Sequence, residues 1–201
     1  KGTAMKRHFG KWLAAAVLAV GCTTITAGAF TDTTGHWAES AINKWSQEYG
    51  IIQGYDDGTF RPDNSITRGA FAGILDRFLH FQETSPASTF SDTAGTYWED
   101  AILKLHASGV YLGNQGKALS ASTITRQQAV AMIGRAFNIP LETTSVSYSD
   151  GSSIAEYALP YVAEFEAHGY LTDCTDGRFR PTDAITRAEI VNILGNMIHT
   201  L

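Results

Sequence analysis

Three arginines in this chain follow a threonine within the same short motif, Ile-Thr-Arg. They are Arg68, Arg126 and Arg187, here called the motif arginines. Threonine is a favoured N-cap residue, so each arginine falls in the first turn of an expected helix. The helix dipole presents its positive end there, and a cation costs roughly a few tenths of a kcal/mol. Backbone N–H groups at a helix start, together with a forked guanidinium, favour an anion. The motif arginines are therefore candidates for anion binding.

Helix capping explains the other residues of the motif. Thr186 and Glu189 have the spacing of a capping box, in which each side chain bonds the backbone N–H of the other residue. Thr125 and Gln128 keep this box, whereas Thr67 keeps only the cap. Such caps contribute about 1 kcal/mol. Stability of the helix therefore accounts for the threonine and the glutamate, but not for the arginine.

The elements that must position these arginines come from a unit that recurs three times. Phe-Thr-Asp at Phe30 returns as Phe-Ser-Asp at Phe90 and as Tyr-Ser-Asp at Tyr148, and the Ile-Thr-Arg motif recurs at similar intervals of about 60 residues. Polar, turn-rich stretches connect the units. The predicted divisions are 1–29 (signal peptide), 30–82 (unit one), 90–140 (unit two) and 148–201 (unit three).

Each unit is predicted to form two helices around a loop. In unit one, Ala38, Ile42 and Trp45 form an apolar stripe of helical period, and Gly50 follows as a helix stop. A second stripe begins at Phe71. Two short helices cannot bury both stripes alone, so neighbouring units must share a core. We expect a mainly α fold whose three units close around a pseudo-threefold axis.

The loop between the helices of unit one carries turn residues and acidic residues. Asp57-Gly58 and its counterpart in unit three predict short hairpins, because glycine accepts a positive φ. Unit two lacks this pair and should have a loop of different shape. Asp56, Asp57 and Asp63 do not have the alternating ligands or the final glutamate of an EF-hand loop. We therefore expect solvated turn carboxylates and no metal site.

Acidic and aromatic residues recur at the head of each unit. The structural alternative to anion binding is an ion pair between a motif arginine and an acidic residue of a neighbouring unit. Those acidic residues, here called the head aspartates, are Asp32, Asp92 and Asp150. The two roles are compatible, since an ion pair also orients the guanidinium. Trp37 and Trp98 offer flat apolar faces that suit a sugar ring and suit core filling equally.

The first 29 residues have the order of a secretory signal. Basic residues follow Met5, an apolar run spans 12–20, and Ala27-Gly28-Ala29 supplies a cleavage site. The run is shorter than the ~20 residues that span a bilayer. We predict cleavage after Ala29. Lipidation of Cys22 is the alternative, although a lipobox usually has a larger aliphatic residue than the one found three positions earlier.

Charge and cysteine content limit the function classes. Four of the 15 basic residues precede the predicted cleavage site while all 20 acidic residues follow it, so the net charge changes from −5 to −9. Such acidity argues against nucleic acids and anionic membrane surfaces as partners. Only Cys174 follows the cleavage site, so no intramolecular disulfide is expected in the mature chain.

Catalytic signatures are missing from the sequence. A glycosidase needs two carboxylates about 5–10 Å apart in one cleft, whereas these acids are spread over the repeats. The histidines show no His-Glu-x-x-His spacing, and there is no Gly-x-Ser-x-Gly elbow or complete Walker motif. We expect no enzymatic activity and no cofactor.

Residues 30–201 resemble three tandem S-layer homology domains. The resemblance rests on "FTD…HWAESAI…GIIQGYDDGTFRPDNSITRG", on "YSD…GYLTDCTDGRFRPTDAITRAE" and on the looser "FSD…YWEDAI…GVYLG…ITRQQ". It implies a pseudo-trimeric helical spindle with a central three-helix bundle and ligand grooves between outer prongs. It also implies non-covalent attachment of exported proteins to secondary cell-wall polymers, commonly bearing pyruvylated N-acetylmannosamine.

The resemblance assigns roles to particular residues. The pyruvate carboxylate would be the anion that the motif arginines bind. Arg187 matches the family motif best, Arg68 comes next, and Arg126 matches least because its loop departs from the family pattern. The head aspartates match the acidic position of the family, and Tyr157 replaces its tryptophan in unit three. The candidate ligand-binding residues are Arg187, Arg68, Arg126, Asp32, Asp92, Asp150, Trp37, Trp98, Thr186, Thr67 and Glu189.

These implications lead to one main expectation and one alternative. The resemblance implies a non-catalytic module that anchors an exported or S-layer protein to the wall of a bacterium by binding an acidic polysaccharide. As a module it should be secreted and monomeric, without a membrane span after cleavage. The alternative is a protein–protein assembly scaffold of the cell envelope, whose grooves take an acidic segment of a partner.

Overall fold

A computed structural model describes residues 30–199, and the predicted signal peptide and Cys22 lie outside this range. The described chain is mainly α, as the sequence predicts, with π-helical and 3₁₀ turns but no β-strand in this range. The helices and turns are α2 (Glu39–Asn43), η1 (Lys44–Glu48), α3 (Arg68–Leu79), η2 (Ala87–Thr89), α4 (Glu99–Ala107), α5 (Arg126–Ala136), η3 (Gly151–Ser153), α6 (Leu159–Ala167) and α7 (Arg187–His199).

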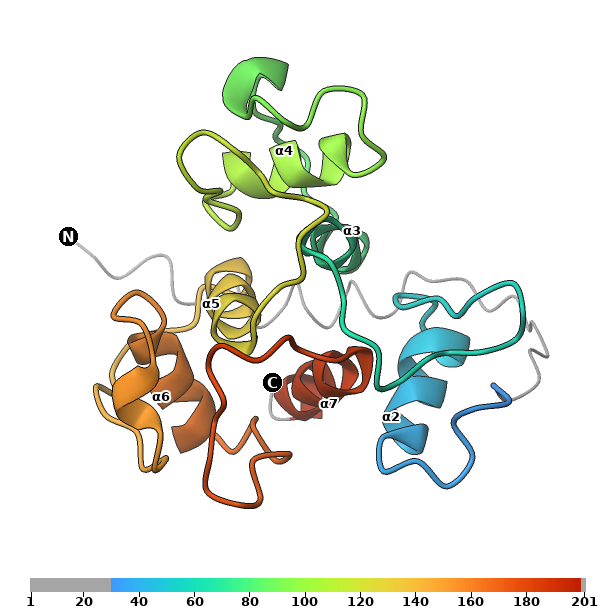
Figure 1. The fold of residues 1–201 in the computed structure, drawn as a ribbon, viewed down its shortest axis with the longest axis vertical. Helices are drawn as coiled ribbons and strands as arrows, with labels where there is room; N and C mark the ends of the chain where they lie inside the picture. Colours follow the sequence, from blue (N-terminus) through green and yellow to red (C-terminus); the bar gives the residue numbers. More distant parts are fainter. Residues whose placement is uncertain (1–29, 200–201) are drawn as a thin grey trace, which may run out of the picture.

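Each first helix packs on the second helix of a different unit. The outer helices contact central ones in the pairs α4 with α3, α6 with α5, and α2 with α7, and the central helices α3 and α5 also contact each other. Figure 1 shows α3, α5 and α7 in the middle, with α2, α4 and α6 in three outer prongs. The α2–α7 contact joins the beginning of the described chain to its end. Burial of the apolar stripes therefore depends on contacts between units as well as within them.

Aromatic side chains link the core across units one and two. Trp45 of η1 stacks edge-on against Phe78 of α3, with ring centroids 5.4 Å apart. Phe78 in turn lies 5.6 Å from Phe137, which directly follows α5. All three rings are buried. The predicted stripe residue Trp45 thus contributes to a core that both units share.

Hydrogen bonds between loops and helix starts join the three units in a ring. The amide of Arg68 donates to Ser122 of unit two at 2.9 Å, and the amide of Arg126 donates to Asp183 of unit three at 2.9 Å. The amide of Arg187 then donates to Asn64 of unit one at 3.0 Å. Isolated β-bridges accompany each of these links. The start of every second helix is therefore fixed by the loop of the next unit.

The helix stops follow the sequence prediction, but the hairpins do not form as strands. Gly50 has a φ of +65° just after η1, as expected for a C′ glycine. At Asp57-Gly58 the chain makes one turn, in which the amide of Tyr55 donates to Thr59 at 2.8 Å. The ladder goes no further because the next two amides, of residues 60 and 61, donate to a head aspartate instead. The prediction of hairpins was wrong for this reason.

No helix among residues 30–199 combines the length and the apolar character that crossing a bilayer requires.

Candidate functional site

Each motif arginine clamps the loop of the next unit. All three are buried, with Arg68 and Arg187 9% exposed and Arg126 2% exposed. Their Nε atoms donate to backbone carbonyl oxygens. The bonds are Arg68 to Ala118 (3.1 Å), Arg126 to Phe179 (2.8 Å) and Arg187 to Phe60 (2.9 Å). The arginine that helix capping leaves unexplained therefore has a structural role between units.

The head aspartates hold the same loops from the other side. Asp32 accepts the amides of Phe60 (2.8 Å) and Arg61 (2.7 Å). Asp92 and Asp150 accept the corresponding amide pairs in units two and three. Burial alone would raise the pKa of these carboxyls, but the backbone N–H bonds lower it, and each pKa lies below its ordinary value.

Direct ion pairs between motif arginines and head aspartates do not form among residues 30–199. This alternative was wrong because the two side chains bind different groups of one loop segment. The aspartate takes the N–H of residue 60, 118 or 179, and the arginine takes the C=O of the same residue. Both side chains act on the loop without meeting each other.

The helix N-termini offer no amides to an anion, contrary to the expectation from the dipole. The amide of Arg68 donates to Ser122, and the amide of Gly69 donates to Ser120, both at 2.9 Å. The amide of Ala70 donates to the cap Thr67 at 3.2 Å. The starts of α5 and α7 use their first three amides in the same way. The first three amides of α3, α5 and α7 are therefore already hydrogen-bonded within the chain.

The capping residues behave as the sequence predicts. Thr186 accepts the amide of Glu189 at 3.2 Å, and a carboxylate oxygen of Glu189 accepts the amide of Thr186 at 2.7 Å. Thr125 and Gln128 form the same box, whereas Thr67 forms only the cap. The hydroxyl oxygens of the candidate residues Thr67 and Thr186 are thus engaged in helix caps.

The candidate tryptophans occupy unequal positions. Trp98 of unit two lies against α3, where a Cβ added at Gly69 or Gly73 would come within 2.5 or 2.3 Å of its ring. Trp37 is 57% exposed and stacks loosely beside His36, with ring centroids 5.4 Å apart. The helix α7 has alanine and asparagine at the positions of the two glycines of α3. Gly69 and Gly73, which have no side chain, therefore leave the space on α3 that the Trp98 ring occupies.

Aromatic rings lie under all three motif arginines, and the guanidinium carbon of Arg126 is 5.3 Å from the ring centre of Phe179. The guanidinium carbon of Arg68 is 4.9 Å from the ring centre of Tyr111. That of Arg187 is 4.4 Å from Phe60 and 5.1 Å from Tyr55. Arg187 also donates through Nη2 to the carbonyl of Gln53 at 2.7 Å. The sequence analysis did not identify these rings as parts of the site. Tyr55 lies in the loop that precedes the Arg68 motif, and Tyr111 lies in the loop that precedes the Arg126 motif.

Arg126 differs from the other two motif arginines because carboxylates lie next to its guanidinium. Its Nη1 lies 2.7 Å from Asp173 and 2.8 Å from Glu189, and its Nη2 donates to the sulfur of Cys174 at 3.2 Å. Burial lowers the pKa of Arg126, but the two carboxylates outweigh burial and raise it. Burial instead lowers the pKa of Arg187. No carboxylate among residues 30–199 forms an ion pair with Arg68 or Arg187.

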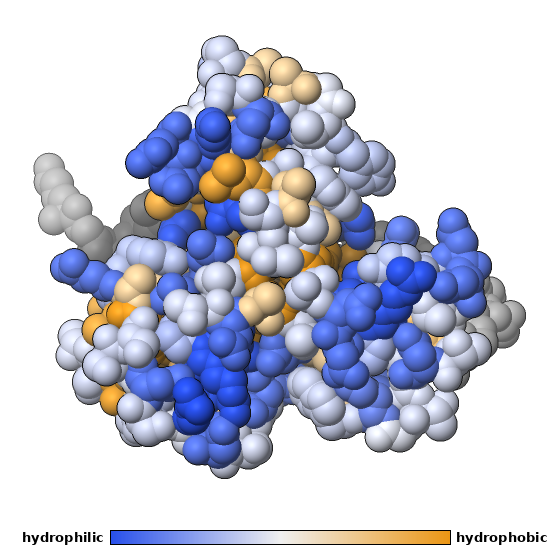
Figure 2. All heavy atoms as spheres, viewed as in Figure 1, coloured by the Kyte–Doolittle hydropathy of each residue, from blue (hydrophilic) through white to orange (hydrophobic). Residues whose placement is uncertain are grey.

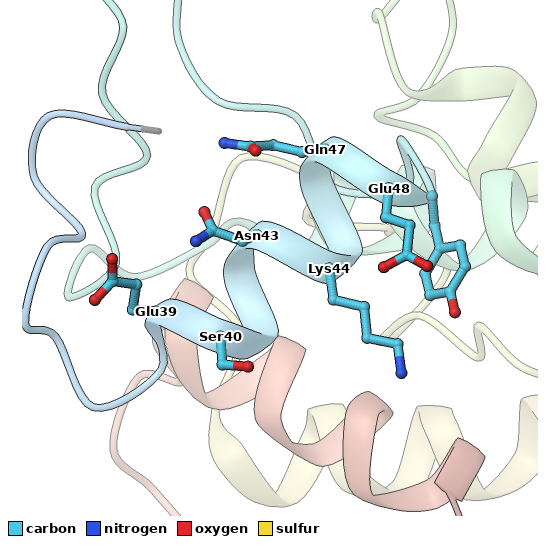
Figure 3. Close-up of a pocket in the computed structure, with 7 residues that line it drawn as sticks. Glu39, Ser40, Asn43, Lys44, Gln47 and Glu48 are labelled. Atoms are coloured by element: carbon cyan, nitrogen blue, oxygen red, sulfur yellow. The ribbon is translucent and has the colours of Figure 1, made fainter. Parts of the chain in front are cut away.

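The hollow along α2 and η1 contains none of the candidate residues. Figure 2 shows hydrophobic surface in the recess between the prong that carries α4 and the rest of the molecule. Figure 3 shows the shallow hollow along α2 and η1 and the side chains that line it. Within residues 30–199, no group of three or more His, Cys, Asp or Glu side chains is placed to hold a metal ion.

Comparison with protein families identifies two matching regions. The model of the S-layer homology domain matches residues 29–72 and 147–191. These regions run from the heads of units one and three into α3 and α7, and each includes one head aspartate and one motif arginine. Unit two lies between them. The matched regions support S-layer homology domains in this chain.

The similar proteins are much longer than this chain, and the similarity covers one part of each. An amylopullulanase of Thermoanaerobacterium thermosulfurigenes is 25% identical over 175 residues, which cover 84% of this chain and 9% of the relative. A cellulosome-anchoring protein of Acetivibrio thermocellus is 27% identical over 158 residues, covering 74% and 35%. The S-layer protein EA1 of Bacillus anthracis is 26% identical over 163 residues, covering 80% and 19%. The chain thus spans about a third or less of each of these relatives.

Proposed function

We propose that residues 30–201 form one module of three S-layer homology repeats that anchors an exported protein to a bacterial cell wall. The family matches in units one and three support this proposal, and so do relatives named as S-layer and cellulosome-anchoring proteins. Unit two is a diverged repeat that keeps the head aspartate and the motif arginine. The module is non-catalytic, and enzyme names among the relatives belong to much longer proteins.

The ligand is an acidic polysaccharide of the wall, bound in grooves between units. One observation carries this proposal: Arg68 and Arg187 are nine-tenths buried and lie on aromatic rings without a carboxylate partner in the described chain. A buried cation without a counter-charge is unfavourable, so an external anion is needed to complete the site. The planar guanidinium matches a carboxylate, such as the ketal carboxylate of a pyruvylated N-acetylmannosamine.

The remaining candidate residues support this site in different ways. The head aspartates fix the loops that the motif arginines clamp, so they position the groove. Trp98 and the exposed Trp37 supply apolar faces for a sugar ring. A signal peptide in residues 1–29 would direct the module outside the cell, in keeping with the names of its surface-protein relatives.

A sedimentation assay with purified wall polymer tests the proposal. Arg187→Gln removes the charge but keeps a hydrogen-bond donor, and it should weaken binding at least tenfold. Arg77→Gln is the matched control, because Arg77 also donates to a backbone carbonyl, that of Ile51. Circular dichroism should show that both variants stay folded. Unchanged binding by Arg187→Gln, or by polymer stripped of its pyruvate groups, would contradict the proposal.

Competition separates the proposal from the scaffold alternative. Free pyruvylated N-acetylmannosamine should release the module from the polymer. Retention in the presence of this sugar, with release by an acidic peptide, would instead favour a protein partner.

A further inference from the structure

We infer that only two of the three equivalent arginines, Arg68 and Arg187, bind ligand anions, because the chain itself neutralises Arg126. This inference rests on the function proposed above and specifies its stoichiometry: two anionic sugars for each module. The third position is occupied by carboxylates that unit three contributes to the interface.

The geometry at Arg126 is that of an occupied anion site. Asp173 and Glu189 both contact Nη1, at 2.7 and 2.8 Å, and their side chains are 10% and 22% exposed. The Nε atom is held by the carbonyl of Phe179, and Nη2 by the sulfur of Cys174. A polymer carboxylate would have to displace two carboxylates and would leave them without their cation. The guanidinium also has little surface left to offer, since Arg126 is 2% exposed.

Comparison of the three units shows that the carboxylates next to Arg126 are found in unit three and not at the equivalent positions of units one and two. A motif arginine contacts the unit that follows it, and unit three follows Arg126. When the units are aligned on their motifs, glutamate at Glu189 corresponds to Ala70 in unit one and to Gln128 in unit two. The interfaces around Arg187 and Arg68 therefore have neutral residues where Arg126 has a carboxylate.

The second carboxylate is also peculiar to unit three. The position of Asp173 is occupied by Gly54 in unit one and by Gly113 in unit two. A Cβ at Gly54 would come within 2.1 Å of the ring of Phe30, and one at Gly113 within 2.3 Å of the ring of Phe90. Units one and two therefore have no room for an aspartate there. Both differences are visible in the sequence once the contact between consecutive units is known.

The first test transfers the blocking carboxylate to a site that lacks one. Ala70→Glu gives unit one the residue that Glu189 supplies in unit three, within reach of Arg187. It also completes the capping box behind Thr67, so the variant should be at least as stable as the wild type. Ala70→Gln is the matched control, because it has the same length and the same box without the charge.

The second test removes the blocking charges from Arg126. Asp173→Gly combined with Glu189→Ala gives unit three the residues found at Gly54 and Ala70 in unit one, and vacates the space next to Nη1 of Arg126. Removing these charges should let Arg126 bind an anion from solution. Because this variant leaves a buried cation without a counter-charge, circular dichroism must show that it folds before its binding is measured.

The readout is the number of arginine side-chain Nε–Hε NMR signals that shift when pyruvylated N-acetylmannosamine is added to the full chain. Signals of Arg68 and Arg187 should shift in the wild type and in Ala70→Gln, only that of Arg68 in Ala70→Glu, and all three in the double variant. A shift of the Arg126 signal in the wild type would overturn the inference and leave the proposed function intact. So would an Arg187 signal that still shifts in a folded Ala70→Glu variant. No shift at any motif arginine of the wild type would overturn the proposed function itself.

Discussion

Replacing Glu189 with alanine should destabilise the chain far more than the same change at its counterpart Gln128. Both side chains close a capping box, with Thr186 and Thr125 respectively. Only Glu189 also pairs with buried Arg126, at 2.8 Å. The two substitutions therefore share one loss and differ in the other, which lets the charge interaction be measured separately.

The magnitude follows from these contacts. Losing the reciprocal bond of the box costs about 1 kcal/mol in both variants. Losing one of the two carboxylate partners of buried Arg126 costs about 1.5–3 kcal/mol more, comparable to an interaction with a charged group elsewhere. The upper range for breaking a buried pair, about 3–5 kcal/mol, does not apply in full because Asp173 still contacts Arg126. We expect Glu189→Ala to lower the free energy of unfolding by about 2.5–4 kcal/mol, and Gln128→Ala by about 1 kcal/mol.

Urea unfolding of the full chain, followed by far-ultraviolet circular dichroism, measures both losses. A change in midpoint at constant slope reports stability, whereas a change in slope would indicate that an intermediate is populated. Equal losses in the two variants would refute the reasoning, because they would mean that the Arg126–Glu189 pair contributes nothing beyond the cap. Glu189→Gln provides the remaining control, since it keeps the box and should lose only the charge interaction.

Three further predictions concern the glycine that packs under Trp98, the buried and exposed tryptophans of unit one, and the head aspartates. Gly73→Ala should destabilise the chain and shift Trp98 fluorescence to longer wavelength, although alanine in a helix usually adds about 1 kcal/mol of stability; a stabilised variant would contradict the close packing. Trp45→Ala should cost about 3–5 kcal/mol in urea unfolding, whereas exposed Trp37→Ala should leave the midpoint nearly unchanged but weaken polymer binding. Because the folded-state pKa values of the head aspartates lie below the unfolded values, their stabilising effect is present above about pH 4 and is lost as the pH falls further. Urea midpoints measured from pH 5 to pH 3 should therefore fall more steeply for the wild type than for Asp92→Asn.

The sequence predicts the helical part of this fold well because its signals are local. An apolar stripe, a C′ glycine and an N-cap threonine each act within a few residues, and the structure confirms them at Trp45, Gly50 and Thr186. The hairpins failed because a distant residue competes for the amides that a ladder needs. Asp32 takes the amide of Phe60, which lies 28 residues further along the chain.

The roles of the motif arginines could not be deduced in the same way. Arg187 donates to the carbonyl of Phe60, 127 residues away, and no local pattern indicates that pair. Reasoning about one helix identified an arginine in an unfavourable position but overlooked the loop that holds it. A usable signal was present in the repeat, because each head aspartate precedes its loop partner by a nearly constant 26–29 residues. That constancy indicates a fixed contact within each unit, and the motif arginine of the preceding unit binds the loop that this contact holds.

At these interfaces, the motif arginines hold the units together and are also the proposed binding residues. A buried arginine clamp could be replaced by an apolar contact of similar volume, often with a gain in stability. The chain instead keeps a cation at all three interfaces, and within residues 30–199 it supplies carboxylate partners to Arg126 but not to Arg68 or Arg187. If the clamp were the whole purpose, the other two cations would need compensation as much as the third. Arg68 and Arg187 without such compensation, next to Tyr111 and Tyr55, are what a site for an external anion requires.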